Sequence, residues 1–292
     1  MSKKLFTIIV SVQVIIIAYL VKSIYFQKTK ILGTSTNPIK QEDITKNPAD
    51  NPNLKNFYEP KAGEIITEQQ EWLKTQPVYI INDDSLNERF NYPVEKSPDT
   101  FRIIALGDSF TFGEYVNTKG NYPEKLEDYL NNTCPKDSKY EVINLGVVGY
   151  DVQYTTERYF KRGQKYSPDL VIWLINDWNF FRINEQLFDR VKEIQNKANA
   201  DGTADQRIKD EGRYYAWTQA QDELVTEMGK DSISSKQLEY FNDFRDSYNG
   251  NLILMIFPDQ IRNNEIDGWF SDFIDKISKI NKNTYVFDEI EF

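Results

Sequence analysis

The stretch that most limits the possible folds is an apolar run that stops at a polar turn, residues 102–106 followed by Gly107-Asp108-Ser109. The run lacks polar alternation and ends at a glycine, which is typical of a short strand buried on both faces. Open α/β sheets bind their ligands beyond the carboxyl ends of the strands. Ser109 stands directly beyond this strand and is therefore the first candidate for a nucleophile.

The same succession of strand, turn and helix recurs along the chain. We expect further strands at residues 140–145, 169–175, 252–257 and 284–287, and helices at residues 121–130, 151–162 (ending at Gly163) and 265–280. Alternating strands and helices predict a parallel sheet covered on both faces. The first three strands end at turns that carry Ser109, Gly149 and Asn176. The sequence thus predicts an α/β domain with a mainly parallel five-stranded sheet that gathers these residues at one edge.

The amino-terminal region predicts a membrane anchor. Residues 5–26 are largely apolar, and at about 1.5 Å per residue they span a hydrocarbon core of roughly 30 Å. Lys3 and Lys4 favour an amino terminus on the inner side, and no small-x-small cleavage site follows the run. We therefore expect residues 1–27 to be an uncleaved single-pass helix that leaves the rest of the chain outside the cytoplasm.

Beyond the anchor, the composition predicts a linker and then a folded domain. Residues 28–75 are rich in Asn, Pro, Lys, Thr and Asp and are expected to form a flexible stalk, with a short helix over residues 64–74. A strand is expected at residues 78–81, within a domain of residues 76–292.

The long connection over residues 178–250 predicts additional helices. Apolar residues recur at helical spacing near residues 187–194 and 238–244. The connection also carries the aromatic residues Phe180, Phe181, Tyr214, Tyr215 and Trp217. Such residues can line a substrate cleft or pack extra helices together, and we favour packing.

The composition excludes several classes of function. A net charge of −10 argues against a nucleic-acid partner, and the single Cys134 allows no internal disulfide. The chain has no histidine, which rules out a Ser-His pair, a Cys-His pair and any histidine metal site. The carboxylates lack metal-ligand spacing, and residues 107–113 lack the Gly-Lys-Ser/Thr ending of a phosphate loop. We expect neither a metal nor a cofactor.

The residues at the three strand ends suit acyl transfer through a serine. This chemistry needs a nucleophile and hydrogen-bond donors aimed at the developing oxyanion. Ser109 can attack, and its own backbone N–H, the backbone N–H of Gly149 and the side-chain amide of Asn176 can form the oxyanion hole. The alternative is a serine that only closes a turn between a strand and a helix.

The neighbouring polar and glycine residues have simpler structural roles. Asp108 is expected to accept backbone N–H groups within its turn, and Asp177 to cap the following segment. Gly146 is expected to serve the turn rather than the chemistry.

Three blocks of the sequence resemble those of the SGNH or GDSL-type esterases and acyltransferases. They are Gly107-Asp108-Ser109-Phe110 with the following Thr-Phe-Gly, residues 144–149 (Asn-Leu-Gly-Val-Val-Gly) and residues 174–177 (Leu-Ile-Asn-Asp), and segments 81–89 and 100–102 also fit. The resemblance runs from about residue 79 to residue 288. It implies a flavodoxin-like three-layer α/β/α sandwich, with Ser109 as nucleophile and Ser109, Gly149 and Asn176 as the oxyanion hole. It also implies hydrolysis of a small-molecule or polysaccharide ester through a covalent acyl-serine.

The sequence departs from the family at two places. Leu174 stands where the third block usually opens with glycine, and no Asp-x-x-His block follows the last strand, where Asp288 stands. The base histidine and its aspartate are therefore missing, either because the chain stops before that block or because the protein has lost catalysis. An O-acetyltransferase of cell-envelope polysaccharide and a non-catalytic carbohydrate-binding or scaffold protein remain as alternatives.

Overall fold

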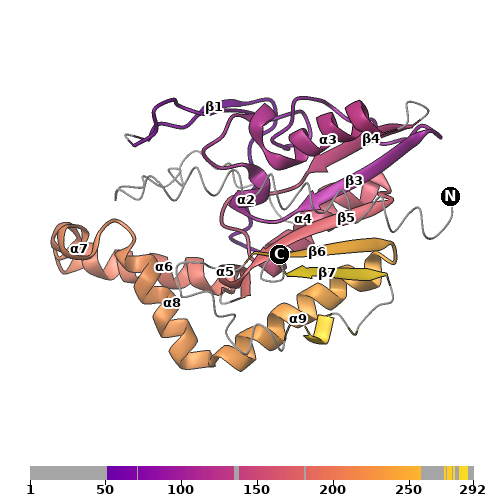
Figure 1. Ribbon diagram of the computed structural model, residues 1–292. Helices are drawn as coiled ribbons and strands as arrows, with labels where there is room; N and C mark the ends of the chain where they lie inside the picture. The colour runs from indigo at the N-terminus through magenta and orange to yellow at the C-terminus, as the bar shows by residue number, and fades with distance from the viewer. Residues whose placement is uncertain are drawn as a thin grey trace.

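The computed structural model describes residues 51–70, 72–134, 138–180, 182–257, 273, 275–277, 279 and 283–288 (Figure 1). Within this part of the chain, one parallel sheet has five strands: β3 (Thr100–Leu106), β4 (Lys139–Asn144), β5 (Leu170–Asn176), β6 (Asn251–Phe257) and β7 (Thr284–Asp288). Their spatial order is β4-β3-β5-β6-β7, or 2-1-3-4-5 along the chain, which is a common doubly wound order. The predicted α/β class and five-stranded parallel sheet are confirmed.

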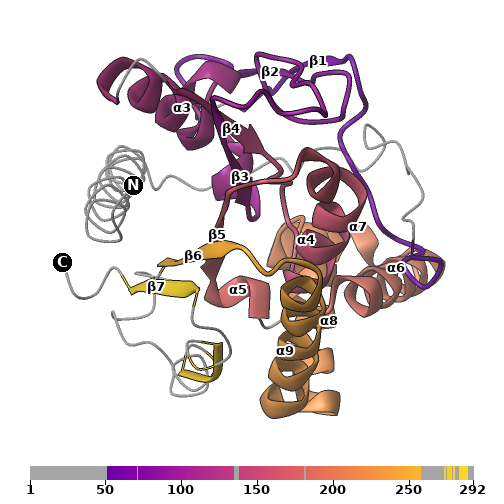
Figure 2. The same cartoon turned by 90° about the vertical axis from the view of Figure 1, so that its right-hand side faces the viewer.

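Side chains alternate between the two faces of the sheet, and helices cover both faces. Helix α3 (Tyr122–Thr133) packs through Leu126 and Leu130 on one face. Helices α4 (Val152–Arg158) and α9 (Lys230–Ser247) cover the other face, where Phe241 and Phe244 of α9 contact Trp173 of β5. Figure 2 shows α3 on one side of the sheet and α4 with α9 on the other.

The predicted helix over residues 151–162 is present, but its predicted end is wrong. Helix α4 continues without a break into the π-helical turn η3 (Tyr159–Gly163) and the 3-10 turn η4 (Gln164–Tyr166), and Ser167 ends it with a φ of 47°. Gly163 is helical, with a φ of −83°. It is packed so closely that a Cβ there would come within 2.8 Å of Leu145 and Tyr159. The glycine therefore permits close packing rather than ending the helix.

The region predicted as a stalk contains folded structure that precedes residue 76. Leu54 and Phe57 are buried, so the folded part begins within the range predicted to be flexible. The helix predicted over residues 64–74 is wrong: β1 (Ile65–Thr67) pairs antiparallel with β2 (Val78–Ile80). The β-branched run Ile-Ile-Thr favours a strand, and pairing with β2 outweighs the helical spacing of its neighbours.

Several of the predicted segments lie wholly or partly outside the described part. The membrane anchor of residues 1–27 and the first part of the stalk are among them. No helix in the described ranges is long and apolar enough to cross a bilayer. Of the helix predicted over residues 265–280, residues 273, 275–277 and 279 are described as helical, and Phe273 and Ile277 are buried in the core.

The connection between β5 and β6 forms a helical arm. It consists of α5 (Asp177–Phe180), α6 (Asn184–Ala200), α7 (Ala204–Glu211), α8 (Tyr215–Met228) and α9, and α6 to α8 extend away from the sheet (Figure 1). Helices α6 and α8 pack through a cluster that includes Leu187, Val191 and Leu224. Tyr215 is buried in this cluster and Phe180 in the core between the sheet and α9, whereas Tyr214 is exposed.

Candidate functional site

The first component of the site is the turn between β3 and α2 (Ser109–Phe112). Asp108 caps α2, because its carboxylate accepts the backbone N–H of Phe110 at 3.1 Å. Gly107 has a φ of +152°, and a Cβ there would lie 2.2 Å from the Thr111 hydroxyl oxygen. This crowding demands glycine and places the half-buried Ser109 at the start of the helix, where backbone N–H groups have no acceptor within the helix.

The second component is the turn after β4. The Asn144 side chain accepts the N–H of Gly146 at 2.9 Å, which shapes the turn. A Cβ on Gly146 would lie 2.3 Å from the backbone nitrogen of Phe112, so this turn packs directly on α2. Gly146 thus serves the turn as predicted, and Gly149 follows with a left-handed φ of +80°.

The third component is the end of β5, and its side chains join all three turns. Asn176 Nδ2 donates to Asp108 Oδ2 at 2.7 Å, and Asn179 Nδ2 donates to the same oxygen at 3.2 Å. Asn179 Nδ2 also donates to the carbonyl of Tyr150 at 2.7 Å. The structure therefore brings the turns of Ser109, Gly149 and Asn176 together at the carboxyl edge, with β3 and β5 adjacent at the point where the strand order reverses.

Three side chains of this arrangement were not predicted from the sequence. Asn179 follows Asn176 by three residues. Its position, as a second amide shortly after the end of a strand, was a sequence signal that could have indicated it. Asn184 donates to the carbonyl of Gly149, and the Tyr58 hydroxyl donates to the carbonyl of Val148. No local pattern indicates these two, since they act across 35 and 90 residues of sequence. The side chain of Asp177 lies outside the described part, so its predicted capping role stays a prediction.

Asp108 has a larger role than predicted. Its expected contact with a backbone N–H is confirmed, but its carboxylate also accepts both Asn176 and Asn179. Because it accepts hydrogen bonds from these three donors, the Asp108 carboxylate holds the turns together.

Asp151 is the second buried carboxylate beside the site. Burial raises the pKa of Asp151 to about 6. Its two oxygens accept the backbone N–H groups of Tyr154 at 2.8 Å and Asn184 at 2.7 Å, so it caps α4 and holds Asn184 in place. Within the described ranges, no group hydrogen-bonds the hydroxyl of Ser109.

No group of three or more His, Cys, Asp or Glu side chains in the described part is arranged to hold a metal ion. A surface hollow of about 440 Å³ lies on the helical arm, lined mainly by α8 and including none of the residues of the three turns.

Comparison of the chain with protein-family models and with curated proteins finds no match.

Proposed function

We propose that the chain carries the acyl-transfer site of an SGNH-type ester hydrolase on a flavodoxin-like sandwich. Ser109 attacks the ester carbonyl, and the N–H groups of Ser109 and Gly149 and the Asn176 amide stabilise the oxyanion. The observation that supports this most is a set of hydrogen bonds that joins the three turns: Asn176 and Asn179 donate to the Asp108 carboxylate, and Asn179 also donates to the carbonyl of Tyr150. The strand order 2-1-3-4-5 supports the flavodoxin-like layout.

The reaction requires a destination for the Ser109 proton. The serine oxygen forms a bond to the carbonyl carbon, the ester alcohol leaves with a proton, and water then releases the acid from the acyl-serine. The sequence contains no histidine to take the serine proton. The nucleophile and the oxyanion donors thus come from this chain, and a base in the solvent accepts the serine proton. The anchor predicted for residues 1–27 would place this site outside the cytoplasm, with an ester of a small molecule or a polysaccharide as substrate.

A reactive phosphonate tests the nucleophile. Incubating the full chain with a fluorophosphonate probe should label Ser109, and the rate should rise about tenfold per pH unit between pH 7 and 9, because only the serine alkoxide attacks efficiently without a base. Labelling should vanish in Ser109→Ala and persist in Ser235→Ala, which changes an exposed serine of α9. Equal labelling of Ser109→Ala would reject the assignment.

The absence of histidine also favours a second candidate, a non-catalytic carbohydrate-binding or scaffold protein. A wild-type chain that stays unlabelled at pH 9 would support this candidate. An O-acetyltransferase would share the same site, and product analysis with a sugar acceptor would distinguish transfer from hydrolysis.

A further inference from the structure

The turn that carries Gly149 is held by side chains from three separate segments. Three consecutive carbonyls each accept a hydrogen bond: Val148 from the Tyr58 hydroxyl at 2.6 Å, Gly149 from Asn184 Nδ2 at 2.8 Å, and Tyr150 from Asn179 Nδ2 at 2.7 Å. A turn that needed only to connect β4 to α4 would not require a side-chain donor on every carbonyl. The arrangement fixes the orientation of three successive peptide planes.

The contact from Tyr58 acts on the peptide that matters for the proposed chemistry. The carbonyl of Val148 and the N–H of Gly149 belong to one planar trans peptide and point in opposite directions. Holding that carbonyl therefore sets the direction of the Gly149 N–H. A hydrogen bond to a peptide carbonyl also polarises the group and strengthens its N–H as a donor.

Gly149 needs such restraint because glycine moves easily between backbone conformations. Its φ is +80°, a region that glycine enters and leaves without a Cβ penalty. A Cβ at this position would lie 2.9 Å from the Tyr58 hydroxyl oxygen, so the phenol lies directly against the glycine. Tyr58 thus supplies both a hydrogen bond to the turn and a steric restraint on Gly149.

Tyr58 is itself fixed by an aromatic cluster. Its ring lies 5.2 Å from Tyr150, 6.0 Å from Tyr154 and 5.7 Å from Phe188, measured between ring centroids and with edge-to-face geometry. The hydroxyl of Tyr150 in turn donates to the carbonyl of Tyr58. Burial raises the pKa of the Tyr58 phenol above its ordinary value, so it remains a donor at neutral pH.

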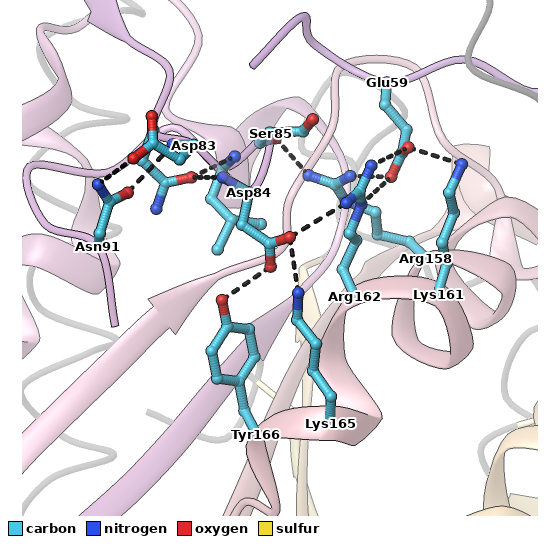
Figure 3. Close-up of polar contacts among 12 residues, drawn as sticks. Glu59, Asp83, Asp84, Ser85, Asn91, Arg158, Lys161, Arg162, Lys165 and Tyr166 are labelled. Atoms are coloured by element: carbon cyan, nitrogen blue, oxygen red, sulfur yellow. Dashed lines mark hydrogen bonds and ion pairs between the residues drawn. The ribbon is translucent and has the colours of Figure 1, made fainter. Parts of the chain in front are cut away.

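The segment that carries Tyr58, residues 51–59, crosses the domain as a strap with anchors on both sides of the tyrosine. Backbone N–H groups of the strap donate to Glu157 and Glu185 at 3.1 and 2.7 Å. At its other end, the buried Glu59 pairs with Arg158, Lys161 and Arg162 (Figure 3). The anchors leave the phenol little freedom relative to the turn.

We propose that Tyr58 is a positioning residue that aims and polarises the Gly149 N–H as an oxyanion donor, which makes the strap part of the active site. This inference rests on the proposed function. It assigns a role in ester chemistry to a segment that lies before the domain predicted from the sequence.

The test is Tyr58→Phe, which removes one oxygen and keeps the ring. Tyr154→Phe is the matched control, because Tyr154 belongs to the same cluster but its hydroxyl donates to Glu185 at 2.7 Å and not to the turn. Glu185 also anchors the strap, and the control leaves its bond from the Lys55 N–H at 2.7 Å in place. The first readout is the amide ¹H–¹⁵N resonance of Gly149 in the full chain, which needs no activity. It should shift in Tyr58→Phe and stay in place in Tyr154→Phe.

The second readout is the kinetics of fluorophosphonate labelling at Ser109. The maximal labelling rate should fall about tenfold in Tyr58→Phe, a part of the hundred- to thousandfold loss expected when a whole oxyanion donor is removed. The probe concentration at half-maximal rate should stay constant, since binding of the probe is not the affected step. Tyr154→Phe should label like the wild type.

The outcomes separate the two proposals. A labelled wild type with an unchanged Gly149 resonance or an unchanged rate in Tyr58→Phe overturns the role of Tyr58 alone. Equal rate losses in both variants would also overturn it, because they would show a general loosening of the cluster. A wild type that is not labelled at all overturns the proposed function, and this inference with it.

Discussion

At the scale of single residues, Asn176 combines two tasks in one amide. Its oxygen accepts the N–H of Asn179 at 3.2 Å, and its Nδ2 donates to Asp108 at 2.7 Å. An amide nitrogen carries two protons, so one remains to meet an oxyanion. The bond to Asp108 orients the amide plane and with it the second proton.

Replacing Asn176 by alanine should slow phosphonate labelling of Ser109 about a hundred- to thousandfold, because the proposed function makes its amide one of the oxyanion donors. The matched control is Asn131→Ala, which removes an amide that joins α3 to the carbonyl of Tyr140 at the other end of β4. The control should label at the wild-type rate. A loss of less than threefold in Asn176→Ala would remove this residue from the oxyanion hole.

The candidate residues that were predicted share one property, which is that each stands directly after a buried strand. Ser109, Gly149 and Asn176 could be found because strand ends are visible in the local pattern and parallel strands align their carboxyl ends. Tyr58 could not be found, because its contact spans 90 residues and depends on how a polar segment folds back. Local patterns carry no information about such a contact.

At the scale of elements, the strap is joined to the helical stretch from α4 to η4 by buried charges. Glu59 is fully buried and bonded by Arg158, Lys161 at 2.9 Å and Arg162 at 2.9 Å. Burial alone would raise the pKa of Glu59, but the three cations outweigh it and lower the pKa to about 2. Arg162 and Lys165 extend the network to Asp84, which also accepts the hydroxyl of Tyr166 (Figure 3).

Glu59→Gln should destabilise the protein by about 3–5 kcal/mol at pH 7, because it leaves buried cations without their counter-charge. A carboxyl whose pKa is lower in the folded protein than in the unfolded chain stabilises the folded protein at pH values above the unfolded pKa. This contribution is lost as the pH falls through the folded pKa. The difference in free energy of unfolding between the wild type and Glu59→Gln should therefore decrease between about pH 4.5 and pH 2, by roughly 3 kcal/mol.

Denaturant unfolding of both proteins across this pH range measures the difference. Glu64→Gln is the control, since its ion pair with Lys61 at 2.6 Å is solvent-exposed and contributes at most about 1 kcal/mol. Equal losses in the two variants would show that the buried network does not hold the strap.

At the scale of the whole molecule, hydrophobic periodicity predicted the sheet but not the extent of the domain. The five parallel strands were predictable because each contains a short apolar stretch close to a polar turn, and α3 and α9 because their apolar residues recur on one face. The composition of the polar strap predicts a linker, and the structure differs because Glu59 and its three cations replace much of the apolar burial that marks a folded segment. The error at residues 64–74 has a different origin: the pairing of β1 with β2 decides the structure there, and it is not visible in the segment itself.

The molecule as a whole also contains buried carboxylates that oppose folding at higher pH. Glu88 is fully buried, and its pKa is raised well above the ordinary value by burial and by the neighbouring Glu124. Its Oε1 accepts the N–H of Asn144, so it packs against the strand that leads to the Gly149 turn. Glu127 lies in the same cluster, and burial raises its pKa too.

The sign of this effect is opposite to that of Glu59. A carboxyl whose pKa is higher in the folded protein than in the unfolded chain contributes its full stability at pH values below the unfolded pKa. The protein loses that stability as the pH rises from the unfolded pKa toward the folded pKa. Glu88→Gln keeps the acceptor for Asn144 and cannot ionise. It should match the wild type at pH 4 and exceed it by about 1–4 kcal/mol at pH 8, measured by denaturant unfolding. The control is Glu95→Gln, at an exposed position, which should show no such pH-dependent gain in stability. If Glu88→Gln were less stable than the wild type at pH 8, Glu88 would be charged in the folded protein.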